Sequence, residues 1–305
     1  MKKHCKLLIL IIKFTALAAV INYHIKILIK AFKDFEDDTE YVYNYRFGKV
    51  SYLKKGSGPA LLLLHSPAMG GSKSEWEALI DSLARKYTVY APDLPGFGNS
   101  AKPEISYSSY LYTSFINDFI ENVICEAAVI MASDRSADFS LCAAVFAPKN
   151  FKKLVLISPK GFSELPPKCP YRPIIKKFLE LPLYGTFFYN MIWVDYFLAN
   201  RLLLLYQKSG LPIPCNKLIP KYFCFSEQPS KFAMTALYSG DLNICVKSKA
   251  STVNIPKLIV LGQKDKAEID SEESKLFQEA DILPHLTCDT NKFIGEICSW
   301  IKKQP

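Results

Sequence analysis

The chain has 305 residues, half of them hydrophobic, and a formal net charge of +9. Seven lysines precede the first acidic residue, Asp34, and subtracting them leaves +2 for the rest, so no nucleic-acid-binding surface is indicated. The nine cysteines include no Cys-x-x-Cys pair, which predicts reduced core residues and neither a disulfide framework nor a metal site. The sequence contains no phosphate-binding loop, and we expect no cofactor.

The first predicted element is an apolar N-terminal helix. Residues 7–23 carry a single charge, Lys13, and the stretch continues far enough to cross a hydrocarbon core of about 30 Å. A lysine near the bilayer centre costs about 2.5–3.5 kcal/mol. The alternatives are a helix lying on the membrane surface and a signal peptide, for which Ala16-Leu17-Ala18 resembles a cleavage site. Cleavage would leave the remaining apolar residues exposed, so we predict an uncleaved single-pass anchor over residues 1–33.

The orientation of this anchor does not follow from its flanking charges. Three lysines lie on each side of it, so the positive-inside rule gives no direction. The predicted reduced state of the cysteines favours a cytoplasmic body.

Five short runs are apolar at nearly every position and are separated by helix-length segments. This pattern predicts parallel strands buried on both faces, and hence a mostly parallel sheet with helices on both sides. In chain order the runs are Ala60–Leu64, Thr88–Pro92, Ala128–Ala132, Leu154–Pro159 and Lys257–Gly262.

The third run leads into a sharp turn, after which Phe139–Phe146 predicts a buried helix. A tight turn between a strand and a helix needs small residues two positions before and after its tip, because a larger side chain would collide across the turn. Only Ala132 and Ser136 satisfy this spacing, so the residue at the tip is Asp134.

These runs, this turn and the string Asp-Leu-Pro-Gly-Phe-Gly-Asn-Ser at 93–100 resemble the α/β-hydrolase superfamily, and within it a group of bacterial membrane-tethered proteins. The resemblance covers residues 41–160 and 254–305; the alternative is another doubly wound α/β protein. It implies an α/β-hydrolase fold and an esterase-like hydrolase by descent. The predicted parts are the anchor (1–33), the first part of the core (38–160), a helical lid (161–253) and the second part of the core (254–305).

The resemblance also implies a catalytic triad, with Asp134 in the position of the nucleophile. The acid should follow the strand that ends at Leu261, where Asp265 lies in a matching turn, although a solvated loop aspartate is the alternative. The base should follow the last strand. Of the four histidines only His285 is a candidate, because two lie in or beside the anchor and His65 follows the first apolar run.

The sequence departs from the family pattern around this base. Ile282 stands where the catalytic histidine is expected, and His285 matches a second, usually structural, histidine. Between Asp265 and His285 we predict a helix at Glu272–Glu279 but no final strand. Without a base in reach, neither a serine nor an ester on Asp134 would react further. We therefore predict an incomplete triad and weak or absent catalysis; the alternative is an active hydrolase of a hydrophobic ester-like substrate using Asp134, Asp265 and His285.

An aspartate at the tip also resembles the haloalkane dehalogenases, but these carry tryptophan where this chain has Arg135. We expect Arg135 to pair with the Asp134 carboxylate and not to bind a halide. The hydroxyls of Ser133 and Ser136 are expected to bond to the backbone.

Two backbone amides are candidates for an oxyanion-binding loop, those of Ser66 and Arg135. Pro67 has no N–H to donate, and the segment 68–71 supplies flexible amides; a plain strand-to-helix loop is the alternative. We expect the aromatic-rich stretch Phe187–Leu204 of the lid to pack on the body, although it could contact the membrane or line a tunnel. The predicted partners are thus a membrane, through the N-terminal helix, and a hydrophobic small molecule under the lid.

Overall fold

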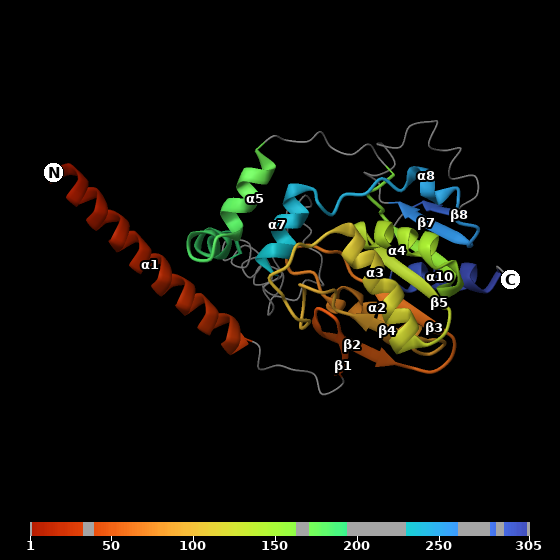
Figure 1. Cartoon of the computed structure of the whole chain (residues 1–305). Helices are drawn as coiled ribbons and strands as arrows, with labels where there is room; N and C mark the ends of the chain where they lie inside the picture. Colours follow the sequence, from red (N-terminus) through yellow and green to blue (C-terminus); the bar gives the residue numbers. More distant parts are fainter. Residues whose placement is uncertain are drawn as a thin grey trace, which may run out of the picture.

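One mixed sheet of eight strands forms the centre of the molecule (Figure 1). The computed structural model describes residues 2–32, 40–162, 171–193, 230–261, 281–284 and 290–303. The strand order is β1-β2-β4-β3-β5-β6-β7-β8. β1 and β2 pair antiparallel with their neighbours, and every pair from β4 to β8 is parallel. The predicted mostly parallel α/β sheet is confirmed.

All five predicted strands are present, with ends that differ by no more than three residues. The largest difference is in β6, which begins at Phe151 because Phe151 already pairs with Ala128 of β5. The strands are β1 (Glu40–Tyr45), β2 (Gly48–Lys55), β3 (Ala60–Leu64), β4 (Thr88–Pro92), β5 (Ala128–Ser133), β6 (Phe151–Ile157), β7 (Lys257–Leu261) and β8 (Asp281–Pro284).

β8 shows that the prediction of no final strand was wrong. It pairs in parallel with β7, and Ile282 lies inside it opposite Ile259. The pattern does not predict this strand because it has four residues and ends in proline. At the edge of a sheet a proline is tolerated, since no neighbour there needs its N–H.

The helices cover both faces of the sheet and bury alternate residues of each central strand. In β3, Leu62 and Leu64 belong to one hydrophobic cluster, and Leu61 and Leu63 to the other. The first cluster includes residues of α3 (Ser109–Phe119) and α4 (Arg135–Phe146), and the second includes residues of α2 (Glu77–Leu83) and α10 (Thr290–Lys303). The short 3₁₀ helices η1 (Lys73–Trp76) and η3 (Pro148–Asn150) and the π-helix η2 (Ile120–Ile124) complete this part of the chain.

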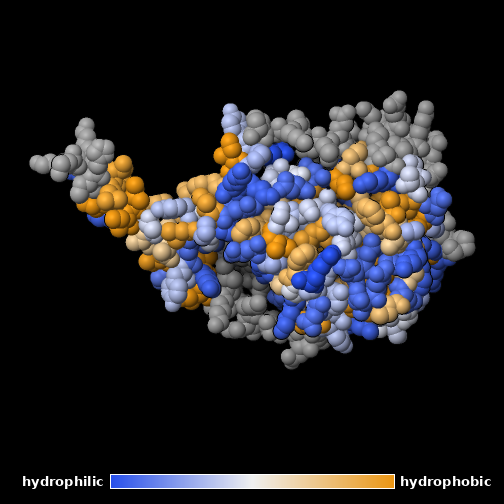
Figure 2. Space-filling view, viewed as in Figure 1, coloured by the Kyte–Doolittle hydropathy of each residue, from blue (hydrophilic) through white to orange (hydrophobic). Residues whose placement is uncertain are grey.

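The N-terminal helix α1 (Lys2–Phe32) extends away from the body, with its first residues at the far end (Figure 1). Over Lys6–Ile27 it is long and apolar enough to cross a membrane, which is also true of a signal sequence. In the space-filling view, hydrophobic side chains gather on the part of this helix that projects from the body (Figure 2).

Helices also occupy the part of the chain between β6 and β7 that the structure describes. They are α5 (Arg172–Glu180), a helical segment at 184–193, α7 (Lys231–Ser239) and α8 (Lys247–Ala250). In the predicted aromatic stretch, Tyr189 and Trp193 are buried, whereas Phe188 and Ile192 are exposed. A lid function for these helices and the division of the chain into four parts stay predictions.

Candidate functional site

Asp134 forms the tip of a strained turn between β5 and α4. Its φ of 53° and ψ of −128° belong to a region that costs a non-glycine residue about 1–3 kcal/mol. The turn is held by the bond from the Asp134 N–H to the Ile157 carbonyl at 2.9 Å. Ala132 and Ser136 are both fully buried, as two small residues packed across the turn must be. The predicted tip residue is confirmed.

The Asp134 carboxylate has two polar neighbours. Ser66 Oγ donates to Oδ2 at 3.1 Å, and the Arg135 guanidinium lies 3.7 Å from Oδ1. Arg135 is itself held by a bond from its Nε to Asn243 Oδ1 at 3.1 Å. The predicted pairing of Arg135 with Asp134 is confirmed. Since this cation sits beside the carboxylate, it lowers the tendency of Asp134 to attack an electrophile.

Glu75 in η1 is a partly buried carboxyl group that the sequence analysis did not identify. Its Oε2 accepts the Ser66 N–H at 2.7 Å, and its Oε1 accepts the hydroxyl of Ser133. Burial raises the pKa of Glu75 to about 6, although the hydrogen bonds from Ser133 and Ser66 oppose the rise, and the negative charge of Asp134 adds to it. The prediction that Ser133 bonds to the backbone was wrong, because η1 brings this carboxyl group within its reach.

The Ser66 amide is therefore bound to a carboxyl group. Arg135, the other predicted oxyanion donor, is the first residue of α4, where a backbone N–H has no acceptor within the helix. In the loop that follows Ser66, the Ala68 N–H donates to the Ser66 carbonyl and the Gly71 N–H to the Ala68 carbonyl, each at 2.9 Å. The loop thus uses two of its amides for its own conformation.

The carboxyl group of Asp138, which is buried, lies one turn along α4 from the tip. It accepts the Lys160 N–H at 3.2 Å and a bond from the Gly161 backbone. Burial raises the pKa of Asp138 to about 7, and the charge of Asp134 adds to the effect. The charge of Asp134 thus acts on both Glu75 and Asp138, and both carboxyl groups are mainly neutral at mildly acidic pH.

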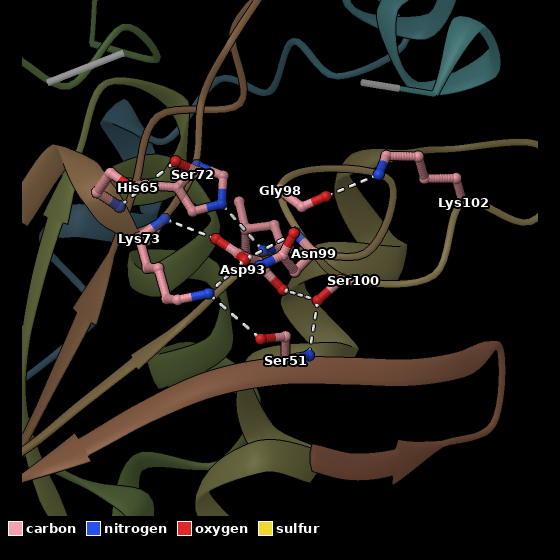
Figure 3. A network of polar contacts seen from close by, with 11 residues as sticks. Ser51, His65, Ser72, Lys73, Asp93, Gly98, Asn99, Ser100 and Lys102 are labelled. Carbon is pink, nitrogen blue, oxygen red and sulfur yellow. Dashed lines mark hydrogen bonds and ion pairs between the residues drawn. The ribbon is translucent and has the colours of Figure 1, made fainter. Parts of the chain in front are cut away.

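The turn after β4 holds another buried acid, Asp93, whose bonds are drawn in Figure 3. Its carboxylate accepts the Lys73 N–H at 2.6 Å, the Lys73 ammonium at 2.9 Å and the Asn99 N–H at 2.9 Å. Ser100 Oγ donates to the Asp93 carbonyl at 2.6 Å. This network ties the turn at 93–100 to η1, which also carries Glu75.

His65 is fully buried beside this network (Figure 3). Its Nε2 accepts the Leu94 N–H at 2.9 Å, and its Nδ1 lies 2.9 Å from the Ser66 carbonyl. Nδ1 must then carry the proton, and burial lowers the pKa of the ring. Both nitrogens are occupied, so His65 is not available as a base, in agreement with the sequence analysis. Ser136 Oγ donates to the His65 carbonyl at 2.6 Å, so the predicted backbone bond of Ser136 is confirmed.

The other two candidate triad residues, Asp265 and His285, lie outside the described residues. In the sequence, Asp265 comes four positions after the end of β7 at Leu261, and His285 directly follows the end of β8 at Pro284. The catalytic roles of Asp134, Asp265 and His285 stay predictions.

Comparison with known proteins agrees with this architecture. Residues 59–186 match the family model described as the alpha/beta hydrolase fold. A hydrolase from Pseudomonas aeruginosa superposes with a TM-score of 0.66 over 87% of this chain and 99% of its own, at 15% identity. A membrane phospholipase A, described as a bacterial virulence factor, superposes with a TM-score of 0.60 over 99% of both chains, at 16% identity. Residues 59–186 therefore match the α/β-hydrolase family in sequence, and the structure as a whole has the α/β-hydrolase fold.

Curated relatives include esterases of this family. A pimeloyl-[acyl-carrier protein] methyl ester esterase of Vibrio campbellii is 25% identical over 214 residues, 69% of this chain and 78% of the relative. An uncharacterized protein of Mycobacterium bovis is 32% identical over 109 residues, 36% of this chain. The matched region spans only 31% of that mycobacterial protein.

Proposed function

We propose that the protein is a membrane-anchored member of the α/β-hydrolase superfamily, esterase-like by descent, with an incomplete triad and weak or absent ester hydrolysis. The observation that carries this proposal is the 2.7 Å bond from the Ser66 N–H to Glu75. In hydrolases of this fold an amide of this loop binds the oxyanion. A carboxyl group on that amide occupies the donor and, when ionised, repels the negative charge that develops in ester hydrolysis.

The state of the tip residue supports the same conclusion. An aspartate nucleophile that attacks the acyl carbon of an ester and expels the alcohol forms a mixed anhydride, which an activated water must then hydrolyse, and that step requires a base. His65 cannot supply it, because both of its ring nitrogens are engaged. The Asp134 carboxylate is itself paired with Arg135 and Ser66. Among the residues that the structure describes, the site retains a shaped turn and polar groups for binding, and His65 does not serve it as a base.

Contacts of α1 with the body support an anchor that is retained. Thr15 Oγ1 lies 2.6 Å from the hydroxyl of Tyr184, and Asn22 donates to the Leu183 carbonyl at 3.1 Å. Ala18 of the same helical face is fully buried. Signal-peptide cleavage after Ala18 would remove Thr15 and Ala18 from this contact. The membrane phospholipase A noted above also aligns along nearly the whole chain, which favours a membrane location for this protein.

One observation favours the second candidate, an active hydrolase of a hydrophobic ester that uses Asp134, Asp265 and His285. β8 ends at Pro284, so His285 follows the last strand in the sequence, as the base of this family does. Because the strands are parallel, the C-terminal ends of β5, β7 and β8 lie on the same side of the sheet. Asp134 directly follows β5 on that side. In this case Asp134 would act as the nucleophile and His285 as the base for the attacking water.

Hydrolysis of p-nitrophenyl butyrate by the full-length protein in detergent separates the two candidates. We expect the same background rate from the wild type, Asp134→Asn and His285→Ala. A fall of about a hundredfold or more in both variants would overturn the first candidate in favour of the second. Asp134→Ser is a sharper probe: with a base in place, the new serine should react with a fluorophosphonate, whereas without one it should not label.

The anchor is tested separately. The intact mass of the protein purified from membranes should include residues 1–33, and the protein should float with vesicles in a density gradient. A mature N-terminus near residue 19, or a protein that remains in the soluble fraction, would contradict the membrane part of the proposal without affecting the catalytic part.

A further inference from the structure

Three residues on one face of α4 contact the two ends of the chain that runs between β6 and β7. Arg135, Asp138 and Cys142 follow one another at spacings of three and four residues, which puts their side chains on the same side of a helix. Asp138 and Cys142 are buried, so this face is covered by protein. Each of the three binds a different part of the chain between the two strands.

Asp138 binds the beginning of this stretch of chain. Its Oδ2 accepts the Lys160 N–H at 3.2 Å, and the Gly161 backbone also donates to the carboxyl group. A Cβ built on Gly161 would lie 3.1 Å from Asp138 Cγ and 2.3 Å from the Ile244 carbonyl oxygen. A side chain at position 161 would therefore push the carboxyl group and the returning chain apart.

The end of the stretch closes on the same place. The Val246 N–H donates to the Gly161 carbonyl at 2.9 Å. Gly161 is thus bonded to Asp138 on one side and to the returning chain on the other. A single carboxyl group of α4 therefore lies where the chain leaves the sheet and where it comes back.

The other two residues of this face hold the returning chain. Arg135 Nε donates to Asn243 Oδ1 at 3.1 Å, and Lys249 Nζ of α8 donates to Cys142 Sγ at 3.6 Å. Helices α4 and α8 lie side by side (Figure 1). We call the contact of residues 160–161 and 243–249 with α4 the junction.

One oxygen of Asp138 is poorly placed for a negative charge. Among the residues that the structure describes, its Oδ1 is buried without a hydrogen-bond partner, whereas Oδ2 accepts the Lys160 N–H. An ionised carboxylate shares its charge between both oxygens, and a buried charge that lacks a donor is unfavourable. A neutral acid can carry its proton on Oδ1 at a lower cost. The geometry of the closed junction thus favours the neutral form of Asp138.

The titratable and charged groups around Asp138 come from α4, from the beginning of the stretch and from α8, and they are Asp134, Arg135, Cys142, Lys160 and Lys249. Burial raises the pKa of Asp138 to about 7, although the backbone bonds from Gly161 and Lys160 oppose the rise. The negative charge of Asp134 adds to the rise, and the positive charge of Arg135 opposes it. Burial also raises the pKa of the Cys142 thiol, so this neighbour is uncharged in the same range.

The stability of the junction therefore depends on pH. In an open junction, water would reach Asp138 and its pKa would return towards the ordinary value of 3.8. The closed junction binds the proton more tightly than the open one. Its extra stability is fully present below pH 3.8 and is lost as the pH rises through 7.

We propose that Asp138 is a pH-sensitive fastening between α4 and the chain that joins β6 to β7, closed when its carboxyl group is neutral and loosened when the group ionises. Loosening would release Asn243 from Arg135, the cation that pairs with Asp134. Access to the tip of the turn would then change with pH. Neither the membrane anchor nor any catalysis is needed for this behaviour.

Hydrogen–deuterium exchange of the full-length protein in detergent, followed by mass spectrometry, measures the junction in the peptides that contain the Lys160 and Val246 amides. Division by the intrinsic exchange rate at each pH gives a protection factor. We expect the wild-type protection factor in both peptides to fall about tenfold or more between pH 5 and pH 8. In Asp138→Asn it should stay constant, because asparagine does not ionise and keeps an oxygen that accepts the Lys160 N–H.

Glu75→Gln is the matched control variant. Burial also raises the pKa of Glu75 into this range, and the charge of Asp134 acts on it as well, but its bonds go to Ser66 and Ser133 and not to the junction. The fall at Val246 should therefore persist in this variant. The amide of Ile130, which lies in β5 between β3 and β6, reports opening of the whole sheet and should not lose protection in parallel.

Constant protection of Val246 in the wild type, or the same fall in Asp138→Asn, would overturn the proposal. Loss of protection in Asp138→Asn at both pH values would overturn it too, because the ionised carboxylate would then be what closes the junction. A parallel fall at Ile130 would mean that the whole protein unfolds. Asp134→Asn keeps the test open if Asp138→Asn does not fold: it removes a charge that raises the pKa of Asp138 and should move the fall to lower pH, and an unmoved fall counts against the proposal.

Discussion

The Ser66 backbone N–H donates to Glu75 Oε2 at 2.7 Å, and this bond links the loop after β3 to η1. The other oxygen of Glu75 accepts the hydroxyl of Ser133, the residue before the tip. Glu75 therefore organises the two segments that would bind an oxyanion in a hydrolase of this fold. An arrangement of this kind stabilises the loop in the absence of substrate and opposes negative charge there.

The first prediction concerns Glu75→Gln. Burial raises the pKa of Glu75 from 4.5 to about 6, so the folded state binds this proton more tightly than the unfolded state. The resulting stability is fully present below pH 4.5 and is lost as the pH rises through 6, a loss of about 2 kcal/mol. Glutamine mimics the protonated acid: its oxygen can accept from Ser66 and its amide can donate to Ser133. We therefore expect the variant to melt above the wild type at pH 8 but not at pH 4.

A melting series from pH 4 to pH 8 checks this expectation. Asp81→Asn serves as the control, because Lys55 lowers the pKa of the exposed Asp81, and no gain at pH 8 is expected from its removal. A Glu75→Gln variant that is less stable than the wild type by the same amount at every pH would contradict this prediction, because the ionised carboxylate would then stabilise the folded state as well as the neutral acid does.

The second prediction concerns the strain at the tip. Asp134 has a φ of 53°, which glycine adopts at little steric cost, so Asp134→Gly should release part of about 1–3 kcal/mol of strain. Asp134→Asn is the matched comparison, because it also removes the charge but keeps the side chain. We expect the free energy of unfolding, measured in urea, to be about 1 kcal/mol higher for the glycine variant than for the asparagine variant. The opposite order would mean that the turn is not strained at this residue.

The sequence predicted those features that depend on local pattern and sterics. β3 and β5 were predictable because strands buried on both faces are apolar at every position. The tip at Asp134 was predictable because only one frame puts small residues on both sides of it. β8 was missed because a four-residue edge strand has no such pattern, and its proline suggests a turn.

The buried carboxyl groups could not be predicted in the same way. Glu75 stands in a polar segment next to Ser74, and Asp138 lies in a helix beside Phe139, without a motif at either position. Their burial results from contacts with residues far along the chain, such as Ser133 for Glu75 and Lys160 for Asp138. The Asn22–Asn190 contact between α1 and the helical segment at 184–193 likewise joins residues 168 positions apart.

The third prediction compares two lysine–aspartate pairs of similar length. Lys73 lies 2.9 Å from Asp93, with side chains 13% and 2% exposed, whereas Lys55 lies 2.7 Å from Asp81, with side chains 55% and 76% exposed. Lys73→Met should cost about 3 kcal/mol, because it leaves a carboxylate buried without its cation. Lys55→Met should leave the stability unchanged within error, because water screens that pair. Denaturant unfolding measures both variants, and equal losses would contradict the role given to burial.

The last prediction tests the turn that connects Asp93 to the rest of this network. Gly98 has a φ of +47°, and a Cβ built on it would lie 2.2 Å from the Asp93 carboxyl carbon. Gly98→Ala should therefore displace the carboxylate from its donors and lower the stability by at least about 2 kcal/mol.

Gly295→Ala is the control for Gly98→Ala, because a Cβ there meets no atom within 4 Å and the residue lies inside α10. It should raise the stability by about 0.5–1 kcal/mol, since alanine favours a helix. Thermal unfolding of the two variants should thus give shifts of opposite sign. If Gly98→Ala instead has the melting temperature of the wild type, the turn has room for the added methyl group. The close packing of Gly98 against Asp93 then does not hold η1 and Glu75 in place.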